Sequence, residues 1–140
     1  NVKNQINVLI PSMALILKKK TVKNIFKTVD LLACNAVEAK YLWGKFSTKS
    51  DVLKFPVPYI FITNGGGEAW LKINNKIYSA YPQPAPYEKY IGGAGDAAAA
   101  ALIFASFIQN KDPLTSIRIA LSAGRKVLLS PESYYAKKAL

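Results

Sequence analysis

The residues best suited to chemistry are a run of small residues that ends in a carboxylate, Gly92-Gly93-Ala94-Gly95-Asp96, just before an alanine-rich apolar stretch. If that stretch is a helix, its first N–H groups lack intrahelical partners, and the helix dipole adds about half a positive charge there. Such a turn can hold an anion with amides alone. A carboxylate beside it is useful when a hydroxyl must lose its proton while attacking a phosphate. The alternative is a glycine-rich loop in which Asp96 is an ordinary acid of the first helical turn.

A second pair of polar residues, Asn35 and Glu38, follows a short apolar run. Three residues apart on a helix, they lie on one face, so an amide and a carboxylate could together hold a hydrated Mg²⁺ ion and phosphate oxygens. The same spacing is typical of a capping box, in which Glu38 bonds back to the start of the helix. The local sequence favours the capping box.

A third candidate, Thr63-Asn64-Gly65-Gly66-Gly67, again joins an apolar strand to a glycine loop. In open α/β sheets, ligands bind at the carboxyl ends of the strands. Three loops of this kind in one small chain favour a shared nucleotide site more strongly than any one of them does alone.

Short apolar runs alternate with helical patterns along the chain. Strands are predicted at 6–10, 29–33 and 59–63, with a hairpin at 69–80 that turns at Asn74-Asn75. Helices are predicted from the cap Ser12 to about Thr28, from the cap Asn35 to Trp43, and over 47–55, 97–108 and 113–127. The helix over 97–108 should be buried on most of its circumference, and Leu114 should lie on the apolar face of the last helix. The alternation predicts an α/β sheet with helices on both sides.

Composition removes several classes of function. The 140 residues include no histidine and one cysteine, Cys34, which excludes imidazole catalysis, imidazole metal centres and an intramolecular disulfide. An apolar content of 51% excludes a disordered polyelectrolyte. The longest apolar stretch, 97–108, is too short to span a bilayer, and the first residues lack a signal-peptide pattern. We therefore expect no membrane segment and a cytoplasmic location.

The chain carries a formal charge of +11, from 19 Lys and Arg against 8 Asp and Glu. Only Arg118 and Arg125 are arginines, whereas surfaces that bind phosphate backbones usually rely on Arg. No basic stripe with interleaved aromatic residues is present. Solvated lysines on helix faces explain the charge better than a nucleic-acid surface does.

Together the three loops have the order and spacing of the carboxy-terminal half of the ribokinase/PfkB family of carbohydrate and nucleoside kinases. Residues 35–38 resemble the family's Asn-x-x-Glu motif, and residues 93–96 resemble its Gly-Ala-Gly-Asp signature. The resemblance runs from the strand at Ile6 through Val127, and 122–131 is similar to pseudouridine-kinase-like members. It implies a partial ribokinase-like three-layer α/β/α fold. Residues 1–140 would form a single domain, the nucleotide-binding and catalytic half, without the substrate-binding half and lid.

The same resemblance implies roles for individual residues, with ATP and Mg²⁺ as cofactors and a sugar or nucleoside as acceptor. Asp96 would be the catalytic base, and the amides of Gly93, Ala94 and Gly95 would form the anion hole for the transferring phosphoryl group. Asn35 and Glu38 would organise Mg²⁺ and phosphate. The remaining nucleotide contacts would come from Thr63 and Gly65 and, at the border of the adenine pocket, from Ser122 and Ala123.

Several features depart from the family pattern. Tyr90-Ile91 stands where the family usually has Asp-Thr, Glu68 stands where many relatives carry glycine, and five alanines open the helix after Asp96. A sheet cut at its middle would also expose an apolar edge, to be covered by the missing half, a partner protein or a second copy. Two hypotheses follow. The chain is either the catalytic half of a kinase or a catalytically degenerate kinase-fold subunit with a structural role in a larger complex.

Overall fold

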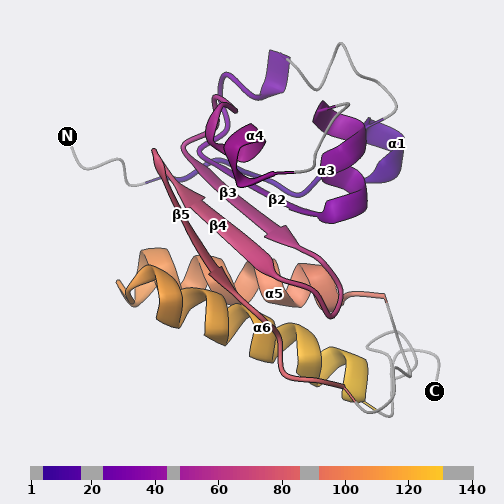
Figure 1. Cartoon of the computed structure of the whole chain (residues 1–140). Helices are drawn as coiled ribbons and strands as arrows, with labels where there is room; N and C mark the ends of the chain where they lie inside the picture. Colours follow the sequence, from indigo (N-terminus) through magenta and orange to yellow (C-terminus); the bar gives the residue numbers. More distant parts are fainter. Residues whose placement is uncertain (1–4, 17–23, 44–47, 86–91, 131–140) are drawn as a thin grey trace. The chain divides into compact units, whose positions relative to one another are not determined.

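The computed structural model describes residues 5–16, 24–43, 48–85 and 92–130. The chain divides into two compact units (Figure 1). The first comprises the residues up to Gly65 together with Ala69–Ser79, and the second comprises Gly66–Glu68 and the residues from Ala80 onward.

A mixed five-stranded sheet forms the centre of the first unit. Its strands, in the order in which they pair, are β1 (Val8–Leu9), β2 (Leu31–Asn35), β3 (Tyr59–Thr63), β4 (Ala69–Ile73) and β5 (Lys76–Ala80). The β1–β2 and β2–β3 pairs are parallel, whereas β3 and β4 are antiparallel. Leu31 to Cys34 are all buried, as is typical of a strand covered on both faces.

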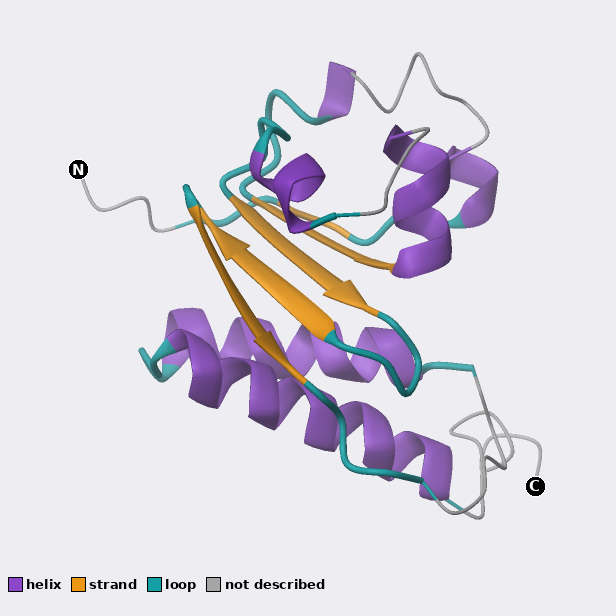
Figure 2. Ribbon diagram, in the orientation of Figure 1, coloured by secondary structure: helices purple, strands orange, loops and turns teal. Residues whose placement is uncertain are grey.

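The described part of this unit includes the helices α1 (Met13–Ile16), α3 (Ala36–Trp43) and α4 (Lys49–Leu53) (Figures 1 and 2). Its core is a cluster in which Ala39 of α3 and Val52 of α4 pack with sheet residues such as Ile60. Phe26 and Phe55 meet edge to face in the same cluster, with ring centroids 4.8 Å apart. One face of the sheet is therefore covered by the helices that follow its own strands.

The second unit is a pair of helices that lie side by side (Figure 2). Helix α5 (Ala94–Ile103) continues as a π-helical turn, η1 (Phe104–Ile108), and is followed by α6 (Pro113–Leu129). Asp112 caps α6 by accepting a hydrogen bond from Thr115 N at 3.0 Å, and Pro113 stands in its first turn. The buried residues of both helices are mostly small, namely Ala98, Ala99, Leu102 and Ala105 on one side and Ser116, Ile117, Ala120 and Gly124 on the other.

The structure confirms the α/β class and most of the predicted elements. The strand at 59–63 and both hairpin strands have the predicted bounds, and Asn74 takes the positive φ of 51° that a tight hairpin turn requires. Ser12 precedes α1 as its cap and accepts a hydrogen bond from Leu15 N. Asn35 likewise directly precedes α3.

Several predicted boundaries are wrong. The strand predicted at 6–10 is Val8–Leu9, and the helix predicted over 47–55 is Lys49–Leu53. The second strand begins at Leu31 rather than Val29, because Asn7 fixes the preceding residues: its Nδ2 donates to the Thr28 carbonyl and its N donates to Asp30 Oδ2. The helix predicted from Ser12 to Thr28 is helical at 13–16 and 24–25, and Phe26 to Thr28 form a turn. Residues 17–23 of that prediction lie outside the described residues.

The predictions for the two later helices also need correction. Helix α5 begins at Ala94 rather than Ala97, and the predicted helix over 97–108 is not buried on most of its circumference, because Ala100, Phe104 and Ile108 are exposed. The buried residues of α5 are Ala98, Ala99 and Leu102, of which Ala98 lies beside Gly124 of α6. Leu114 is 41% exposed and lies off the buried stripe of α6, which starts at Ser116 and Ile117.

Candidate active site

Within the described residues, no side chain caps the first amides of α5. Gly93 is the N-cap and has a φ of +87°, a left-handed conformation that glycine adopts without steric cost. Because glycine has no side chain to act as a cap, the first amides of α5 receive no acceptor from it, while Ala97 N donates back to the Gly93 carbonyl at 2.9 Å. Asp96 is the third helical residue and is exposed. Its carboxylate thus shares one turn with amides that can bind an anion.

A hollow of about 580 Å³ lies along α6 in the same unit. Its lining residues recur every three or four positions: Thr115, Arg118, Ile119, Ser122, Ala123 and Lys126. Ser122 and Ala123, the residues expected to border an adenine, are therefore both part of it. The cations Arg118 and Lys126 were not predicted, although they stand one helical turn on either side of Ser122 and could have been found from that spacing. Two cations beside small residues fit an anionic nucleotide.

Asn35 and Thr63 mark the carboxyl ends of neighbouring strands in the first unit. The parallel pairing of β2 with β3 sets these two residues opposite each other. Glu38, in the first turn of α3, accepts a hydrogen bond from Asn35 N through Oε2 at 2.9 Å, and Asn35 Oδ1 accepts one from Glu38 N at 2.8 Å. The structure thus brings Asn35, Glu38 and Thr63 to one edge of the sheet. It confirms the capping box that the local sequence favoured.

The loop after β3 holds Gly65, whose φ of +53° again favours glycine. A Cβ built at Gly65 or Gly66 would meet nothing within 4 Å. Backbone conformation rather than lack of space therefore calls for glycine at position 65, and the loop is open to an incoming ligand.

A magnesium ion is compatible with the Asn35–Glu38 pair. Mg²⁺ usually keeps several waters and takes one or two carboxylates together with substrate phosphates. The two capping bonds use Glu38 Oε2 and Asn35 Oδ1, so they do not engage Glu38 Oε1. Over the described residues, no group of three or more Cys, Asp and Glu side chains could hold a metal without help from a substrate. The donor set fits an ion that arrives with the nucleotide.

Cys34, which directly precedes Asn35 in β2, is a buried residue with a free thiol. Burial raises its pKa well above the usual range, and the nearby negative charge of Glu38 raises it further. The thiol is therefore protonated and suited to packing rather than to nucleophilic chemistry.

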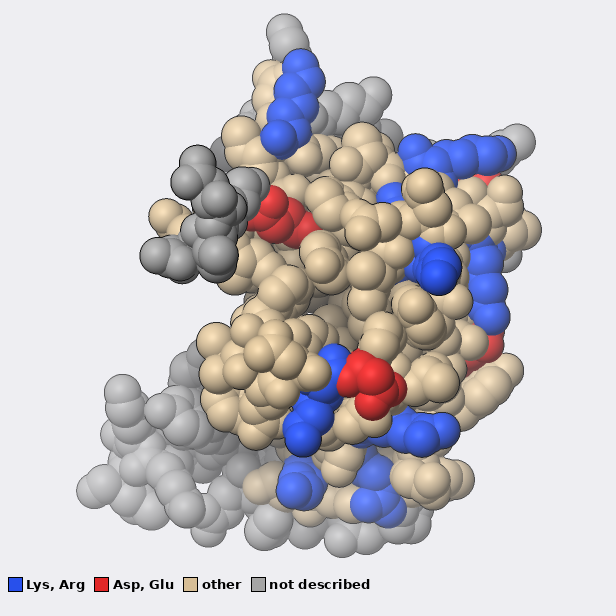
Figure 3. Space-filling view, turned by 90° about the vertical axis from the view of Figure 1, so that its left-hand side faces the viewer, with Lys and Arg blue, Asp and Glu red and all other residues tan. Residues whose placement is uncertain are grey.

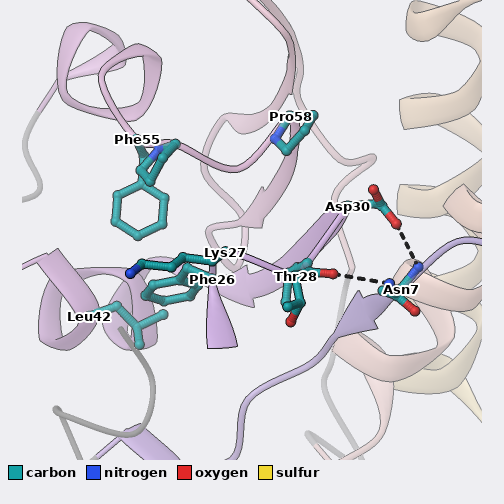
Figure 4. Close-up of a pocket in the computed structure, with 10 residues that line it drawn as sticks. Asn7, Phe26, Lys27, Thr28, Asp30, Leu42, Phe55 and Pro58 are labelled. Carbon is teal, nitrogen blue, oxygen red and sulfur yellow. Dashed lines mark hydrogen bonds between the residues drawn. The ribbon is translucent and has the colours of Figure 1, made fainter. Parts of the chain in front are cut away.

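A second hollow, of about 680 Å³, opens near the amino ends of β2 and β3 (Figure 4). Phe26, Leu42 and Phe55 supply apolar surface, while Asn7 and Asp30 stand at its far side and are joined by a hydrogen bond of 3.0 Å. This hollow lies at the opposite end of the strands from Asn35 and Thr63. Sequence patterns gave no sign of it, because its lining comes from turns rather than from a motif.

The predicted departures from the family pattern fall in different places. Glu68 is half-buried, and the five alanines belong to α5. Tyr90-Ile91 lie outside the described residues.

The surface charges and the helices concern two other classes of partner, nucleic acids and membranes. On the face drawn in Figure 3, Lys and Arg side chains form separate groups with uncharged residues between them. Among the helices of the described segments, none combines the length and hydropathy needed to cross a membrane.

Comparison with known proteins identifies the family. The sequence matches the pfkB family of carbohydrate kinases over residues 1–139, and the chain belongs to that family. Comparison with curated protein sequences gives no match.

Solved structures place the fold among ribokinase-type kinases. The chain is similar to a nucleoside kinase from Burkholderia thailandensis solved with inosine, with 19% identity and a TM-score of 0.75 over 89% of this chain and 42% of that one. A Methanocaldococcus jannaschii nucleoside kinase of the ribokinase family gives 17% identity and a TM-score of 0.77 over 92% and 43%. Arabidopsis thaliana ribokinase, solved with ribose and ATP, gives 21% and 0.67 over 78% and 38%. The chain thus spans less than half the length of each of these relatives.

Proposed function

We propose that this chain is the nucleotide-binding and catalytic half of an ATP-dependent kinase that phosphorylates a hydroxyl of a sugar or nucleoside. The observation that carries the proposal is the first turn of α5, where open amides and the exposed Asp96 carboxylate share one helix start. Membership of the pfkB family supports the same chemistry.

In this mechanism Asp96 accepts the proton of the acceptor hydroxyl while that oxygen forms a bond to the terminal phosphorus of ATP and ADP departs. The amides at 93–95 hold the phosphoryl oxygens as their charge grows, in the manner of an oxyanion hole. The α6 hollow, with Ser122, Ala123 and its two cations, holds the nucleotide. Thr63 and Gly65 contribute from the loop after β3. Bound Mg²⁺ would neutralise phosphate charge, held by Asn35 and Glu38 together with waters.

The proposal includes a partner for the edge strand. Among the described strands, β1 pairs with β2 alone, and Val8 and Ile10 are 37% and 46% exposed. Unpaired strand edges favour association with another strand. The rest of a pfkB-type kinase, a partner protein or a second copy of this chain would cover it, and the acceptor would bind to residues supplied there.

The experiment is ATP turnover by the natural full-length protein over a panel of sugars and nucleosides, with pseudouridine included because of the similarity over 122–131. Asp96→Asn should lower kcat by at least about a hundredfold, as expected for loss of a general base. Asp112→Asn is the matched control, because it neutralises another exposed aspartate of the same unit at a helix start.

Activity that survives Asp96→Asn would rule out Asp96 as the base. Binding of Mg·ATP with no turnover of any acceptor by the wild type would favour the second hypothesis, a catalytically degenerate kinase-fold subunit with a structural role. The departures at Glu68 and Tyr90-Ile91 are the sequence features that support that hypothesis.

A further inference from the structure

Helix α6 approaches the first turn of α5 most closely at Gly124. A Cβ built on Gly124 would lie 3.0 Å from the carbonyl oxygen of Ala94 and 3.5 Å from the Cβ of Ala98. The first of these distances is shorter than an ordinary van der Waals contact, and the atom it meets is backbone rather than a flexible side chain. Gly124 is itself buried, in the stripe that α6 turns toward α5. No larger residue fits there unless Ala94 moves.

The same two segments also lie near each other one turn further along α6. A Cβ on Gly93 would lie 4.0 Å from Cγ1 of Val127. Gly124 and Val127 are three residues apart and therefore lie on one face of α6. This face of α6 lies against the Gly93–Ala94 turn. The backbone conformation of Gly93 and Ala94 sets the direction of the first amides of α5.

We propose that Gly124 is a positioning residue that sets the place of the Gly93–Asp96 turn through direct backbone contact with Ala94. The inference rests on the proposed function for its catalytic consequence, but the contact itself does not depend on it. Gly124 directly follows Ser122 and Ala123, which line the α6 hollow. The stretch of α6 that receives the nucleotide thus also fixes the amides that would receive its terminal phosphate.

For Gly124→Ala, the close approach to Ala94 predicts an unfavourable effect, whereas helix propensity predicts a favourable one. In a helix interior, alanine is more favourable than glycine, so Gly124→Ala would strengthen α6 if nothing stood beside it. Here the added methyl group must push the Ala94 carbonyl by a few tenths of an ångström. An error of this order at a reacting centre is costly, because catalysis by positioning tolerates little displacement.

The test has a ligand-free arm. In ¹H–¹⁵N spectra of the natural full-length protein, Gly124→Ala should shift the amide resonances of Gly93, Gly95 and Asp96, and a crystal structure should show Ala94 displaced. Ala120→Gly is the matched control, since it weakens the same helix interface one turn away without adding an atom near Ala94. It should lower thermal stability and leave those amides unshifted. If the amides stay in place in Gly124→Ala, the proposal is wrong.

The second arm uses turnover. Gly124→Ala should lower kcat by about tenfold or more while the KM for the acceptor changes less than about twofold, because the displaced amides act on the transferring phosphoryl group. Ala120→Gly should leave both constants near wild type at temperatures where it is folded. Equal losses in the two variants would make Gly124 merely structural and overturn the proposal.

A variant that adds no bulk covers the case in which Gly124→Ala does not fold. Val127→Ala removes the methyl groups that lie near Gly93. Faster hydrogen exchange is then expected at Ala97, whose N donates to the Gly93 carbonyl at 2.9 Å, and unchanged exchange at Ala97 would contradict support of the turn by α6. If the wild type phosphorylates nothing, the proposed function fails, yet the spectra and the exchange rates still decide the positioning role.

Discussion

Asn35 and Glu38 bond to each other twice, each through its side chain to the other's backbone N–H, at 2.8 and 2.9 Å. The same reciprocal arrangement recurs at the start of α4, where Thr48 N donates to Asp51 Oδ2 and Asp51 N donates to Thr48 Oγ1. The described residues thus include capping boxes at the starts of both α3 and α4, and the bonds of the α4 box are longer, at 3.2 and 3.4 Å. Only one of these boxes stands at the carboxyl end of a strand in register with Thr63.

Substitutions of Glu38 should separate capping from metal binding. Glu38→Ala should lower the free energy of unfolding by about 1 kcal/mol, the usual cost of a lost cap. Glu38→Gln keeps an acceptor for Asn35 N, so its stability should stay near wild type. If Glu38 also holds Mg²⁺, Glu38→Gln should raise the Mg²⁺ concentration required for turnover about tenfold or more, as measured by Mg²⁺ titration of the full-length protein.

The control for that prediction is Asp51→Asn, which makes the same charge change in the box of α4. It should leave the Mg²⁺ requirement unchanged. A shift of equal size in both variants would mean that Glu38 acts only as a cap.

Asp112 should make the free energy of unfolding depend on pH in the acidic range. Its hydrogen bonds with Thr115 hold the pKa of its carboxyl below the ordinary 3.8. The stabilisation by the ionised carboxylate is thus present above the unfolded pKa and is lost as pH falls through the lowered folded value. Asp112→Asn keeps a capping oxygen but removes the charge. Thermal unfolding should show the wild type more stable than this variant near pH 6, with the difference disappearing near pH 2; a constant difference would contradict the assignment.

Lys72 of β4 should make the stability depend on pH in the alkaline range. Its side chain is 4% exposed and donates to the Phe55 carbonyl, and burial lowers its pKa below 10.5. Between the folded and unfolded pKa values the unfolded chain binds more protons, so stability should rise with pH in that range. Urea unfolding at about pH 7 and pH 10 should show a smaller rise for Lys72→Met than for the wild type.

Lys76→Met, at an exposed position of the neighbouring β5, controls for the loss of one positive charge from the +11 total. If it flattens the pH dependence as much as Lys72→Met does, burial of Lys72 is not the cause.

Cys34 should be almost unreactive in the folded chain. The side chain is 7% exposed, and burial, with a smaller contribution from Glu38, raises the pKa of its thiol. We expect an aromatic disulfide reagent to modify it at least about a hundredfold more slowly than it modifies the chain unfolded in guanidinium. Ser50→Cys in a Cys34→Ala background places a thiol on the exposed surface of α4 and should react rapidly without denaturant. Rapid labelling of native Cys34 would contradict its burial.

The sequence predicted those parts of the fold that depend on local patterns. The apolar run 59–63 and the two halves of the 69–80 hairpin carry both their periodicity and their turn residues within a few positions, so their bounds followed. The start of β2 could not be predicted in this way, because Leu31 enters the sheet where Asn7, more than 20 residues away, fixes Thr28 and Asp30. The burial of α5 could not be predicted either, since it depends on how the helix packs in the folded chain.

The candidate site divides in the same way. Motif spacing identified Asn35, Glu38 and the Gly93–Asp96 turn, because each is a short segment whose backbone geometry follows from its own residues. The roles of Gly124 and Val127 could not be predicted. Nothing in residues 120–129 indicates that the Ala94 carbonyl oxygen would lie only 3.0 Å from a Cβ at position 124. Arg118 and Lys126 were not predicted as site residues, although they line the same hollow as Ser122.

The π-helical turn at Phe104–Ile108, closed by a hydrogen bond from Gln109 N to the Phe104 carbonyl at 2.9 Å, fits one more residue into that turn than an α-helix would. Such a turn absorbs the extra residue without rotating the helix on its other side. The small residues at 98–102 therefore keep their alignment with α6, however the segment beyond Ile103 varies in length. Deleting one residue within 104–108 should restore α-helical geometry there and leave the catalytic end of α5 where it is, so insertions and deletions can be tolerated at one end of this helix while the other end stays fixed.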